Sequence, residues 1–162
     1  GMSPALEPIR DGGKKILMWH GTADQRITFE SSLDYYVRVA GHFGNGGPDF
    51  AEIQPWFRYV LAPGVAHCGS GTGPQPQQLF GAMVSWVEQG TAPDGLVASK
   101  AGMTRPLCSF PQTAVYKGGD PNVAASFHCE GNLQTPSAIQ NGRYVRYKHE
   151  TGDELGTYGG PP

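Results

Sequence analysis

The chain has 162 residues, of which 38% are hydrophobic and 16% charged, and its 12 basic and 14 acidic side chains leave a formal charge of −2. This balance excludes disorder of the highly charged kind and gives no basic surface for nucleic acid or an anionic membrane. The 24 glycines and 14 prolines are typical of a loop-rich globular chain, whose length suits one domain or a part of a larger protein.

The first two predicted elements are a strand and a helix. Residues 14–20 (KKILMWH) form a short apolar run that Gly21 closes, a pattern typical of a buried strand ending in a turn. Between residues 29 and 40 the apolar side chains recur at helical spacing, and Gly41 stands where a glycine often ends a helix. The spacing therefore predicts an amphipathic helix after the first strand.

A loop, a second strand and a second helix follow. Residues 41–55 are rich in glycine and predict a surface loop, whereas residues 56–62 (WFRYVLA) predict a strand. An apolar stripe between residues 79 and 87 predicts a helix that ends at Gly90. The order strand, helix, strand, helix indicates a parallel pair in an α/β sheet. Because such sheets are normally several strands wide, we expect this pair to be the edge of a larger one.

Beyond residue 95 the pattern weakens. Residues 113–117 predict one strand, and residues 130–162, with one short stretch at residues 144–147 (YVRY), are interpreted as an appended tail. No internal repeat is visible. Apolar runs stay far below the roughly 20 residues of a membrane helix, no secretory signal is visible, and Gly1-Met2 suggests a late start. Three cysteines, none in a C-x-x-C pair, allow at most one internal disulfide.

Two residues with catalytic potential follow the two predicted strands. Asp24 lies just beyond the first strand, and His67 follows the second in the loop APGVAHCGSGTGP. Functional groups collect at the carboxyl ends of parallel strands, so we expect the two side chains to meet there. A carboxylate that accepts the imidazole Nδ1–H leaves Nε2 to take a proton from a nucleophile. Taken singly, Asp24 also fits a turn residue, and His67 also fits a hydrogen-bonded surface residue.

Four segments in order resemble the C-terminal half of the tannase and feruloyl esterase family of secreted α/β-hydrolases. They are GGKKILMWHGTADQRI with SSLDYY, FRYVLAPGVAHCGSGTGP, MVSWVEQGTAPDGLVASK and TRPLCSFPQTAVYKGGDPNVAASFHC, within residues 12–129. Members of this family cleave esters of phenolic acids such as gallate and ferulate through a serine. The resemblance implies an α/β fold, the C-terminal portion of an α/β-hydrolase. Residues 12–95 would belong to its core, residues 96–129 to a disulfide-closed, loop-rich extension, and residues 130–162 to the tail.

The resemblance also implies roles for single residues. Asp24 becomes the triad acid and His67 the general base, while Cys68 matches a cysteine that pairs in the family with one directly before the catalytic serine. In α/β-hydrolases that serine precedes the acid on a G-x-S-x-G elbow. Only Ser3 lies upstream of Asp24, without this context, and Ser70 follows no strand. We therefore expect the nucleophile, the oxyanion hole and the family's calcium-bearing lid to lie outside this chain, which is expected to need no cofactor and to be inactive alone.

The family's cysteine pattern further implies a disulfide between Cys108 and Cys129. It leaves Cys68 as a free thiol or as a link to another chain or segment. A bridge that closes a loop of this size is worth about 3 kcal/mol in the chain-entropy model. The implied partner is a phenolic ester, with no nucleic acid and no membrane, and the implied location is outside the cell.

Two alternatives remain open from the residues alone. In the first, the chain is a non-catalytic remnant or binding module that forms a homodimer through an exposed sheet edge. In the second, His20, Asp24, His67 and Cys68 converge on a metal ion.

The remaining aromatic and histidine residues carry no expected function. Strand and helix spacing places six aromatic residues in the core rather than on a phenolic-binding surface: Trp19, Tyr35, Tyr36, Trp56, Phe57 and Trp86. No role is assigned to His42, His128 or His149.

Overall fold

Two parallel strands form the centre of the fold. The computed structural model describes residues 2–131, 139–140 and 143–144. Strand β1 (Ile16–Gly21) pairs in parallel with strand β2 (Phe57–Ala62). Helix α2 (Phe29–Phe43) lies between them in the chain, so the predicted unit of strand, helix and parallel strand is present.

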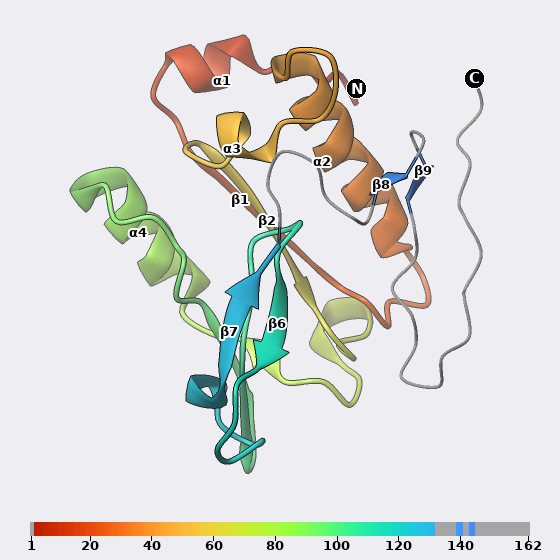
Figure 1. The fold of residues 1–162 in the computed structure, drawn as a ribbon, viewed down its shortest axis with the longest axis vertical. Helices are drawn as coiled ribbons and strands as arrows, with labels where there is room; N and C mark the ends of the chain where they lie inside the picture. The colour runs from red at the N-terminus through yellow and green to blue at the C-terminus, as the bar shows by residue number, and fades with distance from the viewer. Residues whose placement is uncertain (1, 132–138, 141–142, 145–162) are drawn as a thin grey trace.

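Helices cover both sides of this strand pair. In Figure 1, α2 lies on one side of β1 and β2, and helix α4 (Leu79–Gln89), which ends at Gly90 as predicted, lies on the other. Alternate residues of β2 enter two separate cores. Phe57 and Tyr59 pack with α2, whereas Val60 and Ala62 pack in a second cluster that α4 helps to cover. Burial on both faces is expected of a strand in a parallel sheet.

Helix α2 is longer than the sequence predicts. The expectation that Gly41 ends it is wrong, because the helix runs to Phe43 and is closed at Gly44, whose N–H donates to the Ala40 carbonyl at 2.9 Å. A Cβ at Gly41 would meet nothing within 4 Å, so this glycine imposes no turn. Packing favours the extra turn, since the Phe43 ring centroid lies 5.1 Å from that of Trp56.

Two short helices occupy segments for which the sequence predicts none. Helix α1 (Glu7–Asp11) precedes β1, and helix α3 (Phe50–Ile53) interrupts the loop predicted over residues 41–55. The Asp49 carboxylate caps α3 by accepting the backbone N–H of Glu52 at 3.2 Å. Both end residues of α3 are 0% exposed, so burial of two side chains, rather than sequence periodicity, selects this single helical turn.

Trp19 departs from the expectation that the aromatic residues fill the core. Its side chain is 36% exposed, so the prediction is wrong for this residue. Within the described part of the chain β1 pairs only with β2, and no further strand covers its outer edge. Tyr35 is partly buried against the first core, and the other four are at most 4% exposed: Tyr36, Trp56, Phe57 and Trp86.

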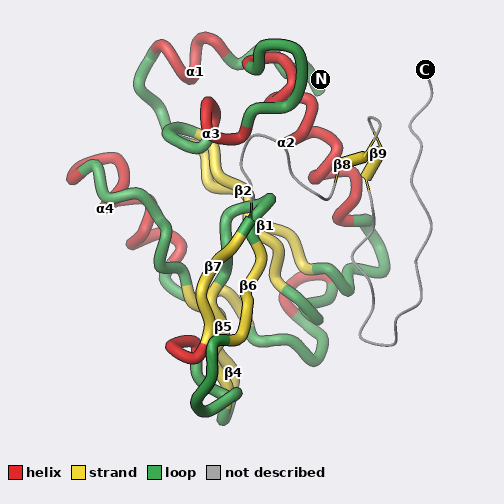
Figure 2. Tube along the Cα trace, viewed as in Figure 1, coloured by secondary structure: helices red, strands yellow, loops and turns green. Residues whose placement is uncertain are grey.

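The segment after residue 95 contains more strand than predicted. The expected strand is present as β6 (Thr113–Tyr116), and it pairs antiparallel with β7 (Phe127–Glu130). A three-stranded antiparallel sheet is formed by β3 (Gln75–Pro76), β4 (Val97–Lys100) and β5 (Met103–Pro106). Short 3-10 turns lie at η1 (His67–Gly69) and η2 (Ala124–Ser126). Figure 2 shows β4, β5, β6 and β7 in the lower half of the molecule, with β6 and β7 overlapping the lower part of the β1–β2 pair in this view.

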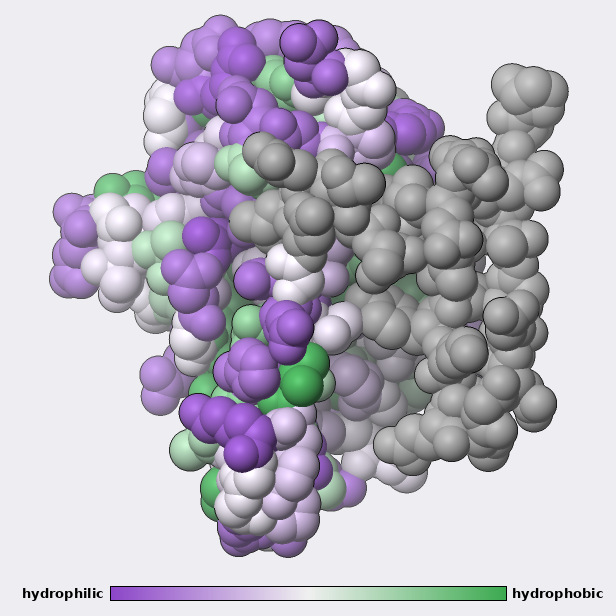
Figure 3. Space-filling view, in the orientation of Figure 1, coloured by the Kyte–Doolittle hydropathy of each residue, from purple (hydrophilic) through white to green (hydrophobic). Residues whose placement is uncertain are grey.

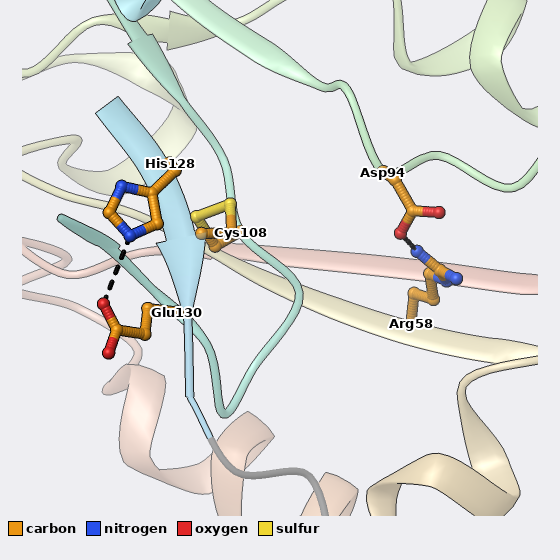
Figure 4. The surroundings of a disulfide bond; sticks show 6 residues. Arg58, Asp94, Cys108, His128 and Glu130 are labelled. Carbon is orange, nitrogen blue, oxygen red and sulfur yellow. Dashed lines mark hydrogen bonds and ion pairs between the residues drawn. A yellow bond between two sulfur atoms is a disulfide. The ribbon is translucent and has the colours of Figure 1, made fainter. Parts of the chain in front are cut away.

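A disulfide between Cys108 and Cys129 holds this antiparallel region together. The two Cα atoms lie 5.5 Å apart, and Cys129 belongs to β7 (Figure 4). Ser109, next to Cys108, forms an antiparallel bridge with Val60 of β2. The disulfide therefore links β7 to a segment that is itself hydrogen-bonded to the central strand pair.

The C-terminal tail is described only in part. Strands β8 (Ile139–Gln140) and β9 (Arg143–Tyr144) pair antiparallel. The remainder of the predicted tail, including residues 145–147 and His149, lies outside the described residues. No helix among the described residues is long and apolar enough to cross a membrane. The face drawn in Figure 3 mixes hydrophilic residues with smaller apolar patches.

Candidate active site

The loops that follow β1 and β2 are hydrogen-bonded to each other. The N–H of Thr22 donates to the Ala62 carbonyl at 3.1 Å, and the N–H of Ala23 donates to the Val65 carbonyl at 3.0 Å. In the other direction, the N–H of Gly64 donates to the Thr22 hydroxyl at 3.2 Å. These three bonds thus set the spacing between the two loops without involving the Asp24 or His67 side chain.

The first loop holds the carboxylate of Asp24 by backbone donors. Its Oδ1 atom accepts the N–H groups of Arg26 and Ile27, both at 2.9 Å, and its side chain is 9% exposed. The N–H of Ile27, followed by that of Arg26 and by the His67 imidazole, holds the pKa of Asp24 far below its usual value of 3.8, although burial opposes this shift. The carboxylate is therefore charged and fixed in direction at neutral pH.

The second loop brings His67 to this carboxylate. Its Nδ1 atom lies 3.0 Å from Oδ2 and 3.2 Å from Oδ1 of Asp24. A carboxylate only accepts, so Nδ1 carries the hydrogen, and in the neutral ring Nε2 is the unprotonated nitrogen. The His67 side chain is 31% exposed, and solvent or a reactant can therefore reach the ring.

Both side chains line one open cavity of about 540 Å³. Its wall includes Trp19 and Gly21 from β1, Ala66 and His67 from the second loop, and Gln75 with Pro76 from β3. The exposed Trp19 ring therefore contributes apolar surface next to the acid–base pair.

The turn at η1 gives His67 its direction. Cys68 has φ 55° and ψ 28°, a left-handed conformation that is uncommon for a residue with a Cβ. The Ser70 hydroxyl donates to the His67 carbonyl at 3.0 Å, so it is bonded to backbone. The Gln75 amide donates to the Gly69 carbonyl and ties the turn to β3. The Cys68 thiol is free and exposed.

A second histidine, His20, lies next to the pair, where the sequence suggested a metal ligand. Nδ1 of His20 lies 2.7 Å from the Ser32 hydroxyl, and Nε2 lies 3.0 Å from the Ile27 carbonyl. Both ring nitrogens are thus occupied by polar groups of the protein. Across the described residues no group of three His, Cys, Asp or Glu side chains is arranged to hold a metal ion, so this part of the structure gives the metal alternative no support.

The sequence indicated that Asp24 could be a turn residue, but it did not identify the groups that hold its carboxylate and the His20 ring in place. Arg26 and Ile27 act through backbone atoms, and Ser32 lies 12 residues from His20 on a helix. The only local signal is a short turn after Asp24, in which a carboxylate commonly accepts N–H groups two and three residues on.

Comparisons with known proteins place this geometry in context. The family model described as "Tannase and feruloyl esterase" matches residues 2–130. The chain is 38% identical over 138 residues to a probable feruloyl esterase of Arthroderma benhamiae, a match that covers 80% of the chain and 25% of that protein. It is 38% identical over 136 residues to a mono(2-hydroxyethyl) terephthalate hydrolase of Piscinibacter sakaiensis, and this match covers 78% of the chain and 21% of that protein.

A solved structure shares the fold. The crystal structure of an esterase from Aspergillus oryzae matches with a TM-score of 0.71 and 29% sequence identity, over 80% of this chain and 30% of that one. The chain therefore spans about a quarter of the length of the curated relatives that it matches.

Proposed function

The chain belongs to the tannase and feruloyl esterase family, and we propose that it carries the acid and the base of a serine carboxylesterase. The observation that supports this most directly is the contact of 3.0 Å between Nδ1 of His67 and the buried carboxylate of Asp24, at the rim of an open cavity. The pair sits where loops follow two parallel strands, the position at which α/β enzymes collect their functional groups.

In the proposed reaction, His67 Nε2 removes the proton of a serine hydroxyl as that oxygen attacks the ester carbonyl carbon. Asp24 accepts the Nδ1–H throughout and stabilises the imidazolium that forms. His67 then gives the proton to the departing alkoxide oxygen, and a water molecule repeats the sequence on the acyl-enzyme. The proton transfers at this site need no cofactor.

We propose that the serine lies outside these 162 residues, in the part of the complete protein that corresponds to the remaining length of the relatives. Loss of the nucleophile removes covalent catalysis, so the chain alone is proposed to be inactive. The proposed substrates are esters of phenolic acids of the ferulate and gallate type. We also propose secretion, because a disulfide such as Cys108–Cys129 persists in oxidising surroundings.

The test is turnover of methyl ferulate and methyl gallate by the complete protein. His67→Ala and Asp24→Asn should each lower kcat by roughly 10³- to 10⁴-fold while the fold is kept. The matched control is His128→Ala, since His128 is also paired with a carboxylate, that of Glu130, but lies beside the disulfide (Figure 4). Turnover that survives His67→Ala would refute the proposed role.

The same ester should distinguish the chain alone from the complete enzyme. The 162-residue chain is expected to hydrolyse methyl ferulate no faster than its own His67→Ala variant. A rate above background that disappears in this variant would show that a nucleophile is present within the chain, contrary to the proposal.

Exposed apolar side chains favour a second candidate, a non-catalytic interaction module. Phe80 and Val87 on α4 are 83% and 61% exposed, and Trp19 lies on a strand whose outer edge is unpaired in the described residues. Such surface is usually covered by a partner. In light scattering of the chain, a dimer that dissociates in Trp19→Ser would support the module, and a monomer at all concentrations would contradict it.

A further inference from the structure

We propose that His20 is a positioning residue for the acid–base pair, acting through Ile27 and together with Ser32; this rests on the proposed function. His20 lies near the end of β1, and its side chain is only 14% exposed. It lines the same cavity as His67, but its ring nitrogens are hydrogen-bonded to Ser32 and Ile27. It is thereby bonded to the loop that holds Asp24.

The hydrogen bonds define the state of the His20 ring. The Ile27 carbonyl only accepts, so Nε2 of His20, at 3.0 Å, must carry the hydrogen and donate it. In the neutral ring Nδ1 then bears a lone pair, and the Ser32 hydroxyl at 2.7 Å donates to it. Ser32 thus selects one tautomer, the one that presents a donor to the loop.

Ile27 connects this donor to the acid. Its carbonyl accepts from His20, while its N–H donates to Oδ1 of Asp24 at 2.9 Å. Nε2 of His20 also lies 3.4 Å from Oδ2 of Asp24, a second and weaker contact that favours the charged carboxylate. His20 on β1 and Ser32 on α2 therefore hold the loop at Ile27. The loop in turn orients the Asp24 carboxylate, which determines the tautomer of His67.

The opposite tautomer would disturb this arrangement. A ring with its hydrogen on Nδ1 would direct the Nε2 lone pair at the Ile27 carbonyl and the Asp24 carboxylate, and repulsion would push the loop outward. At 9% exposure of Asp24 and 14% of His20, water has little room to screen that repulsion. The Ser32 hydroxyl is therefore part of the positioning device, although it is remote from His67.

Nitrogen and proton NMR of the imidazole rings tests this in the chain itself, without any esterase assay. In the native chain we expect a hydrogen-bonded Nδ1–H signal for His67 and the Nε2–H tautomer for His20. His20→Ala should abolish the Nδ1–H signal of His67, and Ser32→Ala should give mixed His20 tautomers and weaken it. His20→Gln, whose amide can still donate to Ile27, should retain it.

The control is His42→Gln, because His42 is paired with Glu7 at 2.6 Å, away from the site. This variant should leave the His67 signal unchanged. If His20→Ala does not fold, Ser32→Ala carries the test. A folded His20→Ala or Ser32→Ala chain with an unaltered His67 signal would overturn the proposal and leave His20 with a purely structural role.

Kinetics of the complete protein separate this inference from the proposed function. His20→Ala should lower kcat by roughly 10- to 100-fold with KM nearly unchanged, because a misplaced base affects the chemical step. His20→Gln should restore most of kcat. Absence of esterase activity in the native complete protein would refute the proposed function alone, since the NMR result stands independently. Equal kcat in native protein and His20→Ala would refute the positioning role alone.

Discussion

At Gly21 one added methyl group would disturb the spacing of the two site loops. A Cβ at this position would lie 2.2 Å from the Val65 carbonyl oxygen, which is 1.2 Å inside the 3.4 Å at which ordinary contact begins. Relief requires the loop after β2 to move, which breaks the 3.0 Å bond from Ala23 to Val65. Overpacking costs about 1–3 kcal/mol and the lost hydrogen bond about 1 kcal/mol, so Gly21→Ala should destabilise by about 2–4 kcal/mol.

Thermal unfolding of the chain, followed by circular dichroism, measures this effect. At about 2–4 °C per kcal/mol the Tm of Gly21→Ala should fall by roughly 4–16 °C. The matched control is Gly41→Ala in α2, where the same methyl group meets nothing within 4 Å. There the change should stabilise by about 0.5–1 kcal/mol, because alanine loses less backbone entropy than glycine in a helix. Equal Tm values for native chain and Gly21→Ala would refute the reasoning.

Three further outcomes are expected. Because the folded-state pKa of Asp24 is depressed below 3.8, its contribution to stability is present above that value and lost as pH falls through the acid range. The free energy of unfolding of the native chain and of Asp24→Asn is measured in urea at several pH values. The difference between the two should shrink only below about pH 5, which is lower than the pH at which imidazoles titrate. A difference that grows as the pH falls would contradict the depressed pKa of Asp24. The double variant Cys108→Ser/Cys129→Ser should lose about 3 kcal/mol in denaturant unfolding, whereas Cys68→Ser should change stability by less than about 0.5 kcal/mol. Phe80→Ser, at a side chain that is 83% exposed, should also stay within about 0.5 kcal/mol by the same measurement.

The central unit was predictable because its signals are local and strong. The run that becomes β2 is a continuous, mostly apolar segment that is buried on both faces, as predicted. The run that becomes β1 does form a strand, but the prediction that it is buried is wrong, because only Gly21 is buried there and Trp19 is exposed. The end of α4 was predictable from Gly90, which adopts φ 71°, a left-handed value at which glycine carries no Cβ penalty. In contrast, Gly41 resembles such a signal but lies inside α2, since only the tertiary contact of Phe43 with Trp56 decides where the helix stops.

The antiparallel region was not predictable to the same degree. Strands β4 and β5 have four residues each, and Val97–Lys100 includes alanine, serine and lysine, which carry little intrinsic preference for strands. Ala98 is 0% exposed because neighbouring segments cover it, and that covering cannot be inferred from its own sequence. The exposure of Trp19 was missed because strand periodicity predicts a buried ring only if another element packs against that ring. No such element covers Trp19 among the described residues.

Part of the candidate site could likewise be predicted from local sequence, and part of it could not. The strand-end position predicted that Asp24 and His67 approach each other, and their contact depends on bonds formed within residues 16–73. The turn that carries His67 is closed by its own backbone, with the Ala66 N–H donating to the Ser70 carbonyl at 2.6 Å. Neither the disulfide nor the antiparallel strands supply a hydrogen bond to either side chain. The two loops therefore set how the acid meets the base, and the antiparallel sheet acts on the site only indirectly, through the bond from Gln75 to the turn that carries His67.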